Sequence, residues 1–98
     1  MIAGVSANEL KIIKNILAPY SSEYEFYFYG SRVKGTFCKT SDLDVLIKGR
    51  KAMPLLDFLE LKEEFDESFL PYIVNFSDYH KIDKKFFELI KNDLVKIF

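Results

Sequence analysis

Two runs of strand-forming residues lie in the first half of this 98-residue chain. The first, Tyr24–Tyr29, is almost entirely aromatic, and aromatic residues favour the pleated, half-buried surface of a sheet. The second, Asp42–Lys48, begins with two aspartates and continues through Val45, Leu46 and Ile47. The loop between them, about eleven residues, needs no crossover helix, so the two strands are predicted to pair antiparallel.

A helix is predicted before the first strand. Ser6 and Glu9 have the spacing of a capping box, in which each side chain bonds to the backbone of the other residue. The helix is expected to begin at Ser6 and to end before Pro19, because proline interrupts helical hydrogen bonding. The apolar side chains at helical spacing in this segment are Leu10, Ile13 and Leu17.

Two further helices and a third strand are expected after the second strand. Pro54 suits the first turn of a helix, Pro71 introduces a strand that runs to Asp78, and Asp83 is placed to cap a final helix. The inward candidates in the first of these helices include Leu55, Leu59 and Phe65. In the second, an apolar stripe is formed by Phe86, Ile90, Leu94 and Ile97. This order predicts one α/β domain over residues 1–98, with a small mixed sheet flanked by helices.

Composition narrows the classes of function. The formal net charge of −1 provides no overall attraction to a polynucleotide, so a nucleic-acid substrate is disfavoured. The single cysteine, Cys38, cannot form an internal disulfide, which is typical of a reducing compartment and predicts a cytoplasmic protein. No signal sequence is recognisable, and no apolar run has the length needed to cross a membrane.

A glycine–serine pair follows the first strand. Gly30 has no β-carbon, so the chain can turn sharply and its amides, together with the Ser31 hydroxyl, can approach phosphate oxygens closely. Arg32 and Lys34 add positive charge beside these donors. This segment therefore predicts a phosphate-binding turn.

Two aspartates open the second strand. Asp42 and Asp44 are one strand period apart, so their side chains point to the same side. Carboxylates placed in this way repel unless a cation lies between them. Because Mg²⁺ binds through one or two carboxylates plus substrate phosphates, the pair predicts a divalent metal site.

The combined pattern, Gly30-Ser31, ten intervening residues and Asp42-x-Asp44, resembles the signature of the DNA polymerase β-like nucleotidyltransferase superfamily. The nearest likeness is to its smallest branch, the minimal nucleotidyltransferases. The resemblance implies a palm-like core in which Gly30 and Ser31 hold the β- and γ-phosphates of a nucleoside triphosphate and Arg32 lies near the phosphate tail. It also implies Mg²⁺ at Asp42 and Asp44, with two ions when nucleotide is bound.

The family usually carries a third carboxylate on a neighbouring strand, which completes the metal site and helps to deprotonate the acceptor. This sequence has Asn75 at that position, and a neutral amide can offer an oxygen to a metal but cannot act as a base. Asp78 is the nearest substitute. Its spacing from Asn75 places it on the opposite face of a regular strand, so it could serve only if a bulge or the end of the strand re-aimed it; otherwise it is a strand-end acid.

The resemblance also implies a partner protein. Minimal nucleotidyltransferases usually accompany a small all-helical HEPN-type protein, often as antitoxin and toxin. On this model the chain is the antitoxin and transfers AMP from ATP to a hydroxyl of its partner, typically a tyrosine, within a hetero-oligomer. The alternative is a binding module that keeps the fold and neutralises a helical partner by contact, with Asn75 marking weakened chemistry.

Overall fold

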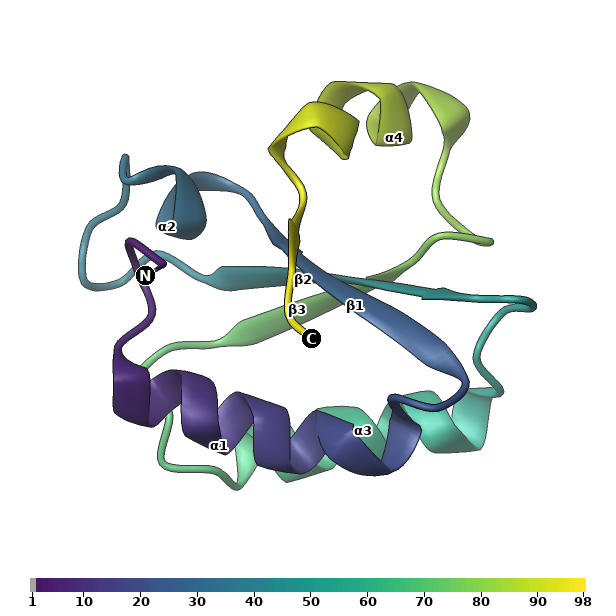
Figure 1. Cartoon of the computed structure of the whole chain (residues 1–98), viewed down its shortest axis with the longest axis horizontal. Helices are drawn as coiled ribbons and strands as arrows, with labels where there is room; N and C mark the ends of the chain where they lie inside the picture. The colour runs from purple at the N-terminus through teal and green to yellow at the C-terminus, as the bar shows by residue number, and fades with distance from the viewer. Residues whose placement is uncertain (1) are drawn as a thin grey trace.

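The computed structural model describes residues 2–98, which form helices around a central four-stranded sheet with the strand order β3-β2-β1-β4 (Figure 1). The strands are β1 (Tyr24–Tyr29), β2 (Leu43–Gly49), β3 (Val74–Asp78) and β4 (Val95–Lys96). The helices are α1 (Ala7–Leu17), α2 (Ser31–Lys34), α3 (Leu55–Asp66) and α4 (Lys84–Ile90), with 3₁₀ turns η1 (Ala18–Tyr20) and η2 (Lys91–Asp93).

The sheet is mixed, as predicted. β1 and β2 pair antiparallel, and their register places Tyr29 opposite Asp44. β3 follows α3 and lies parallel to β2, while β4 pairs antiparallel with the other edge of β1. The third strand begins at Val74 rather than at Pro71, which suits the inability of proline to donate to a strand ladder.

The two faces of the sheet are covered differently. Helices α1 and α3 lie together on one face, and the short α4 lies on the other (Figure 1). Because side chains alternate along a strand, every second residue of β1 and β2 enters the layer beneath α1 and α3. The buried residues of this layer include Ile13, Leu17, Phe26, Phe28, Leu43, Val45, Ile47, Leu61 and Phe65. The remaining strand positions face the thinly covered side, where polar residues are tolerated.

The predicted capping box starts α1. The Glu9 amide donates to Ser6 Oγ at 3.1 Å, and the Ser6 amide donates to Glu9 Oε1 at 2.9 Å. The α-helix ends at Leu17, before Pro19, as expected. Within residues 2–98, no helix has the length and apolar character needed to cross a bilayer.

The predicted inward face of α3 is wrong for two of its three residues. Leu55 is 63% exposed and Leu59 is 50% exposed, whereas Leu61 and Phe65 are buried. Residues two apart on a helix lie on nearly opposite sides, so burial of Leu61 turns Leu59 toward solvent. Leu55 shares the side of Leu59, because residues four apart are neighbours on a helix surface.

The predicted C-terminal helix is too long. Asp83 does cap α4, but this helix ends at Ile90, and Leu94 is already extended where β4 begins. Ile97 is buried, as expected, but it enters the core from beyond a strand: its amide donates to the Phe26 carbonyl at 2.9 Å. β1 otherwise has an unpaired edge, and pairing with β4 satisfies backbone groups there.

We expect Ile97→Ala to lower the free energy of unfolding by about 2 to 4 kcal/mol, because it leaves a cavity beneath β1. Val95→Ala, which truncates a side chain that is 38% exposed, should cost less than about 1 kcal/mol. Urea unfolding of both variants, followed by circular dichroism, measures the difference. Equal losses would contradict the inward placement of Ile97.

Candidate functional site

Asp42, Asp44 and Asn75 meet on the sheet face opposite α1 and α3. Asp44 on β2 is in register with Asn75 on β3, and Asp42 immediately precedes β2. Asn75 Nδ2 donates to Asp42 Oδ2 at 3.0 Å and lies 3.5 Å from Asp44 Oδ1. The structure therefore brings together three residues that the sequence assigned to one site.

The glycine–serine turn lies directly against this group. Gly30 has a φ of +88°, and a β-carbon added there would lie only 2.3 Å from Asp44 Oδ2. Both the backbone conformation and the available space thus require glycine. Gly30 caps α2, and Ser31 is the first residue of that helix and is exposed. The turn and the acids form one continuous surface.

The two basic residues of the turn have other partners. Lys34 Nζ lies 3.3 Å from Asp93 Oδ2, in an ion pair between partly exposed side chains. Arg32 is only 5% exposed, and its guanidinium donates to backbone carbonyls of the loop before β2 and of the N-terminal segment. The structure does not place the Arg32 guanidinium on the exposed surface beside the acids.

Asp78 does not join the acid pair. It is in register with Ile47, toward the far end of β3, and its side chain is buried on the opposite side of that strand from Asn75. Its Oδ2 accepts from the Met53 amide at 2.7 Å, and its Oδ1 accepts from the His80 amide at 2.9 Å. No bulge re-aims it, so the suggestion that Asp78 replaces the third carboxylate has no support in this geometry.

The electrostatics of the pair favour a cation. Burial raises the pKa of Asp44 above its ordinary value, the charge of Asp42 raises it further, and the hydrogen bond from Asn75 partly opposes both effects. The ionised pair is therefore held at a free-energy cost that a positive charge would relieve.

The donor atoms of this site fit Mg²⁺, which prefers oxygen ligands. The Asp42 and Asp44 carboxylates are joined by Asn75, and a half-turn of its amide would present an oxygen in place of the NH₂ group. Residues 2–98 contain no group of three or more acidic, histidine or cysteine side chains placed to bind a metal. Two carboxylates alone leave ligand positions for phosphate oxygens and water.

Buried aromatic side chains that were not predicted as part of the site lie beside Asp44. Tyr29, in register with Asp44, is 7% exposed; its Oη lies 3.0 Å from Ser77 Oγ, and burial raises its pKa. Phe86 of α4 packs edge-on against the Tyr29 ring, with centroids 5.9 Å apart. Strand alternation could have placed Tyr29 here, but only the tertiary fold brings Phe86 to it.

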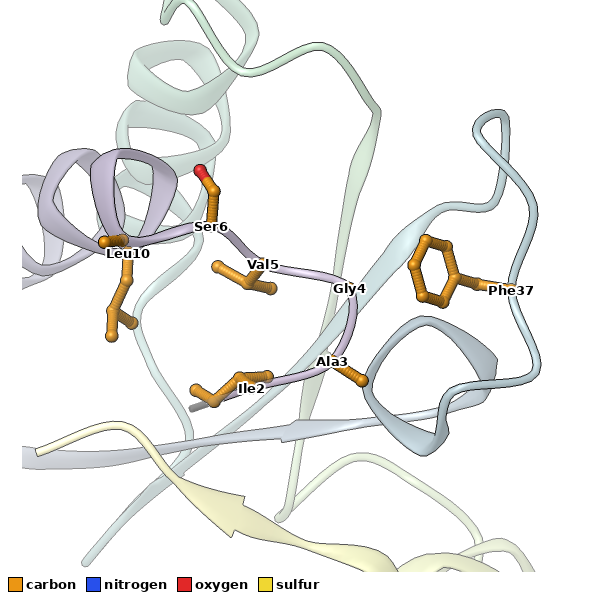
Figure 2. A pocket seen from close by; sticks show the side chains of 8 residues that line it. Ile2, Ala3, Gly4, Val5, Ser6, Leu10 and Phe37 are labelled. Carbon is orange, nitrogen blue, oxygen red and sulfur yellow. The ribbon is translucent and has the colours of Figure 1, made fainter.

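A separate hollow of about 560 Å³ lies beside the N-terminal segment. Its walls consist of Ile2, Ala3, Gly4, Val5, Ser6, Ala7, Leu10 and Phe37 (Figure 2). These residues are mostly apolar, and among the residues that the structure describes the lining includes neither the acids nor the Gly30–Ser31 turn. The hollow is thus distinct from the candidate site.

Comparisons with known proteins agree with the geometry. Residues 10–98 match the model of the nucleotidyltransferase domain family. The chain is 38% identical over 93 residues to a probable protein adenylyltransferase, MntA, from Haemophilus influenzae. That alignment covers 95% of this chain and 82% of the relative.

Two solved structures share the fold. A crystal structure of a toxin–antitoxin with AMP-PNP superposes with a TM-score of 0.74 at 18% identity, over 91% of this chain and 72% of the other. A putative nucleotidyltransferase from Sulfolobus solfataricus has a TM-score of 0.50 at 28% identity, over 89% and 77% of the two chains. The predicted fold class and family are confirmed: the chain belongs to the nucleotidyltransferase domain family.

Proposed function

We propose that this chain is an Mg²⁺-dependent adenylyltransferase, which transfers AMP from ATP to a hydroxyl of a partner protein. One observation carries the proposal: the Asp44 carboxylate lies against Gly30, where even a β-carbon would come within 2.3 Å of Asp44 Oδ2. A turn suited to phosphate and a carboxylate pair suited to a metal are thus in direct contact. A metal-bound triphosphate needs both groups together.

Each part of the site has a proposed role. The Gly30 and Ser31 backbone, with the Ser31 hydroxyl, binds the β- and γ-phosphates. Asp42 and Asp44 hold Mg²⁺, which when bound neutralises phosphate charge and makes the α-phosphorus easier to attack. Asn75 orients the two carboxylates by donating to both of them. Lys34 contributes positive charge near the phosphates once it leaves its exposed pair with Asp93, because such surface pairs are weak.

The choice of ATP and of a protein acceptor rests on likeness. The Haemophilus relative, 38% identical over 95% of this chain, is named a probable protein adenylyltransferase. The fold is also shared with a toxin–antitoxin structure that contains AMP-PNP. We therefore propose that residues 1–98 act as one minimal nucleotidyltransferase domain, the antitoxin of a small helical HEPN-type partner. The exposed free thiol of Cys38 supports a cytoplasmic location for this pair.

A second candidate function is a binding module that neutralises its partner by contact. Asn75 supports it, because its amide donates to Asp42 and cannot accept the proton of an acceptor hydroxyl. On this alternative the fold is retained for recognition and the chemistry is weak or lost.

Label transfer distinguishes the two functions. The protein is incubated with α-labelled ATP, Mg²⁺ and the helical protein encoded beside it. We expect the partner to be labelled. Asp42→Ala should reduce the rate at least about 100-fold, because it removes a proposed Mg²⁺ ligand. Asn75→Asp should raise the rate, because a positioned base commonly contributes a factor of about 10² or more. Asp66→Ala, which removes an exposed acid of α3, is the matched control and should leave the rate unchanged.

The outcomes separate clearly. A silent parent protein whose Asn75→Asp variant transfers label would support the binding module. Undiminished labelling by Asp42→Ala would remove the acid pair from the assigned metal site. Loss of labelling in Asp66→Ala as well would show that the assay reports stability rather than chemistry.

The raised pKa of Asp44 predicts that, without metal, the unaltered protein and an Asp44→Asn variant differ in stability. The fold favours the protonated form, so above this pKa the unaltered protein bears the cost of a buried charge, and acidification through the pKa removes that cost. Asp44→Asn should therefore raise the free energy of unfolding at neutral pH, by less than about 1 kcal/mol because partial exposure screens the charge. The gain should shrink toward acid pH.

Urea unfolding in the presence of EDTA, repeated at neutral and acid pH, measures this difference. Asp66→Asn makes the same chemical change at an exposed position and should show no comparable gain. A destabilised Asp44→Asn variant at neutral pH would contradict the electrostatic cost assigned to the site.

A further inference from the structure

Arg32 is a buried cation at the junction of three segments. Its side chain is 5% exposed, although it belongs to a short surface helix. Its hydrogen bonds all go to backbone carbonyls: Nε to Ser41 at 2.8 Å, Nη1 to Gly4 at 2.8 Å, and Nη2 to Lys39 at 2.9 Å and to Cys38 at 3.3 Å. The planar fork of a guanidinium can serve several carbonyls at once, whereas an ammonium group cannot reproduce this geometry.

Aromatic rings complete the enclosure. Arg32 Cζ lies 4.0 Å from the centroid of the Tyr72 ring and 4.9 Å from that of Phe37. Tyr72 is itself held by a hydrogen bond from its hydroxyl to Glu9 at 3.0 Å. No ion pair between Arg32 and a carboxylate occurs within residues 2–98. Carbonyl dipoles and ring faces therefore stabilise this charge.

The N-terminal segment is shaped to fit Arg32. A β-carbon on Gly4 would lie 2.2 Å from Arg32 Cγ and 2.3 Å from the Arg32 carbonyl oxygen, so only glycine allows this approach. Figure 2 shows the Phe37 ring pointing from its loop toward the N-terminal segment that contains Gly4. The segment thus closes over the arginine from one side while the loop closes from the other.

The position of Arg32 links the two halves of the site. Its backbone directly follows Ser31 of the phosphate-binding turn, and its Nε holds the carbonyl of Ser41, the residue directly before Asp42. The loop between them is exposed from Gly35 to Thr40, and its internal hydrogen bonds gather around Cys38, whose amide donates to Ser41 Oγ and whose carbonyl accepts from the Ser41 amide. Arg32 therefore ties the turn to the residue before Asp42, in addition to the Asn75 hydrogen bond that holds the Asp42 side chain.

We propose that Arg32 is a positioning residue, which fixes the distance between the phosphate-binding turn and the metal-binding carboxylates, rather than a ligand of the phosphate tail. This inference rests on the proposed function. The Arg32 guanidinium is committed to backbone carbonyls, so Arg32 acts through Asp42 and the loop and does not touch the nucleotide.

Substitution tests the inference against a matched control. The chain has a second arginine, Arg50, which is exposed. We expect Arg32→Lys to weaken binding of Mg²⁺ with AMP-PNP about tenfold, as is typical when a residue that orients a metal ligand is lost. Arg50→Lys should stay within about twofold. Isothermal titration is performed at a temperature where circular dichroism shows each variant to be folded, so that unfolding does not affect the measured affinity. An Arg32→Lys variant that is less stable but binds Mg²⁺ with AMP-PNP as tightly as the unaltered protein would overturn the proposal.

A second experiment uses the unaltered protein, so its result does not depend on whether a variant folds. In ¹⁵N NMR, the Arg32 Nε–H signal should be protected from solvent exchange and should stay in place when AMP-PNP and Mg²⁺ are added, while the Gly30 and Ser31 amide signals move. A large shift of the Arg32 signal would identify a phosphate contact and overturn the positioning role alone. Stationary Gly30 and Ser31 signals would instead overturn the proposed function, and the inference with it.

Discussion

The contact between the Gly30 backbone and the Asp44 carboxylate is the constraint on which the site depends. Gly30 lies between β1 and α2 and adopts a φ of +88°, and a β-carbon there would overlap Asp44 Oδ2. Close packing at this point becomes possible because β1 and β2 pair with Tyr29 opposite Asp44. The glycine–serine turn and the two aspartates are thus held together by strand register and not by side-chain reach alone.

The acid pair shows how this small domain accommodates a functional site. Asp44 is half-buried beside another carboxylate, and its raised pKa records an unfavourable charge. Asn75 reduces the strain by donating to the pair, which an aspartate at that position could not do while ionised. Asparagine at position 75, in place of an aspartate, eases the repulsion between the carboxylates but cannot act as a base. Stability without metal and catalytic power therefore favour different residues at position 75.

Local patterns predicted much of the fold. The bounds of β1, the capping box of α1 and the antiparallel pairing of β1 with β2 depend on short-range alternation, capping and loop length, and all agree with the structure. The inward positions of α3 did not, because the rotation of a helix about its axis depends on which residues meet the sheet. The C-terminal strand was missed for a related reason: it forms only because β1, distant in sequence, has an edge to pair with.

For the site, residue types and spacing were enough to specify the groups present and their local order: a glycine turn, two aspartates on one side of a strand, and an asparagine on the next. These follow from residue chemistry and from the two-residue period of a strand. Three other features depend on how the chain folds as a whole: Asp78 lies apart from the pair, Phe86 packs against Tyr29, and Arg32 is enclosed by carbonyls. Burial and hydrogen-bond partners come from segments far apart in the chain, so no local pattern can specify them.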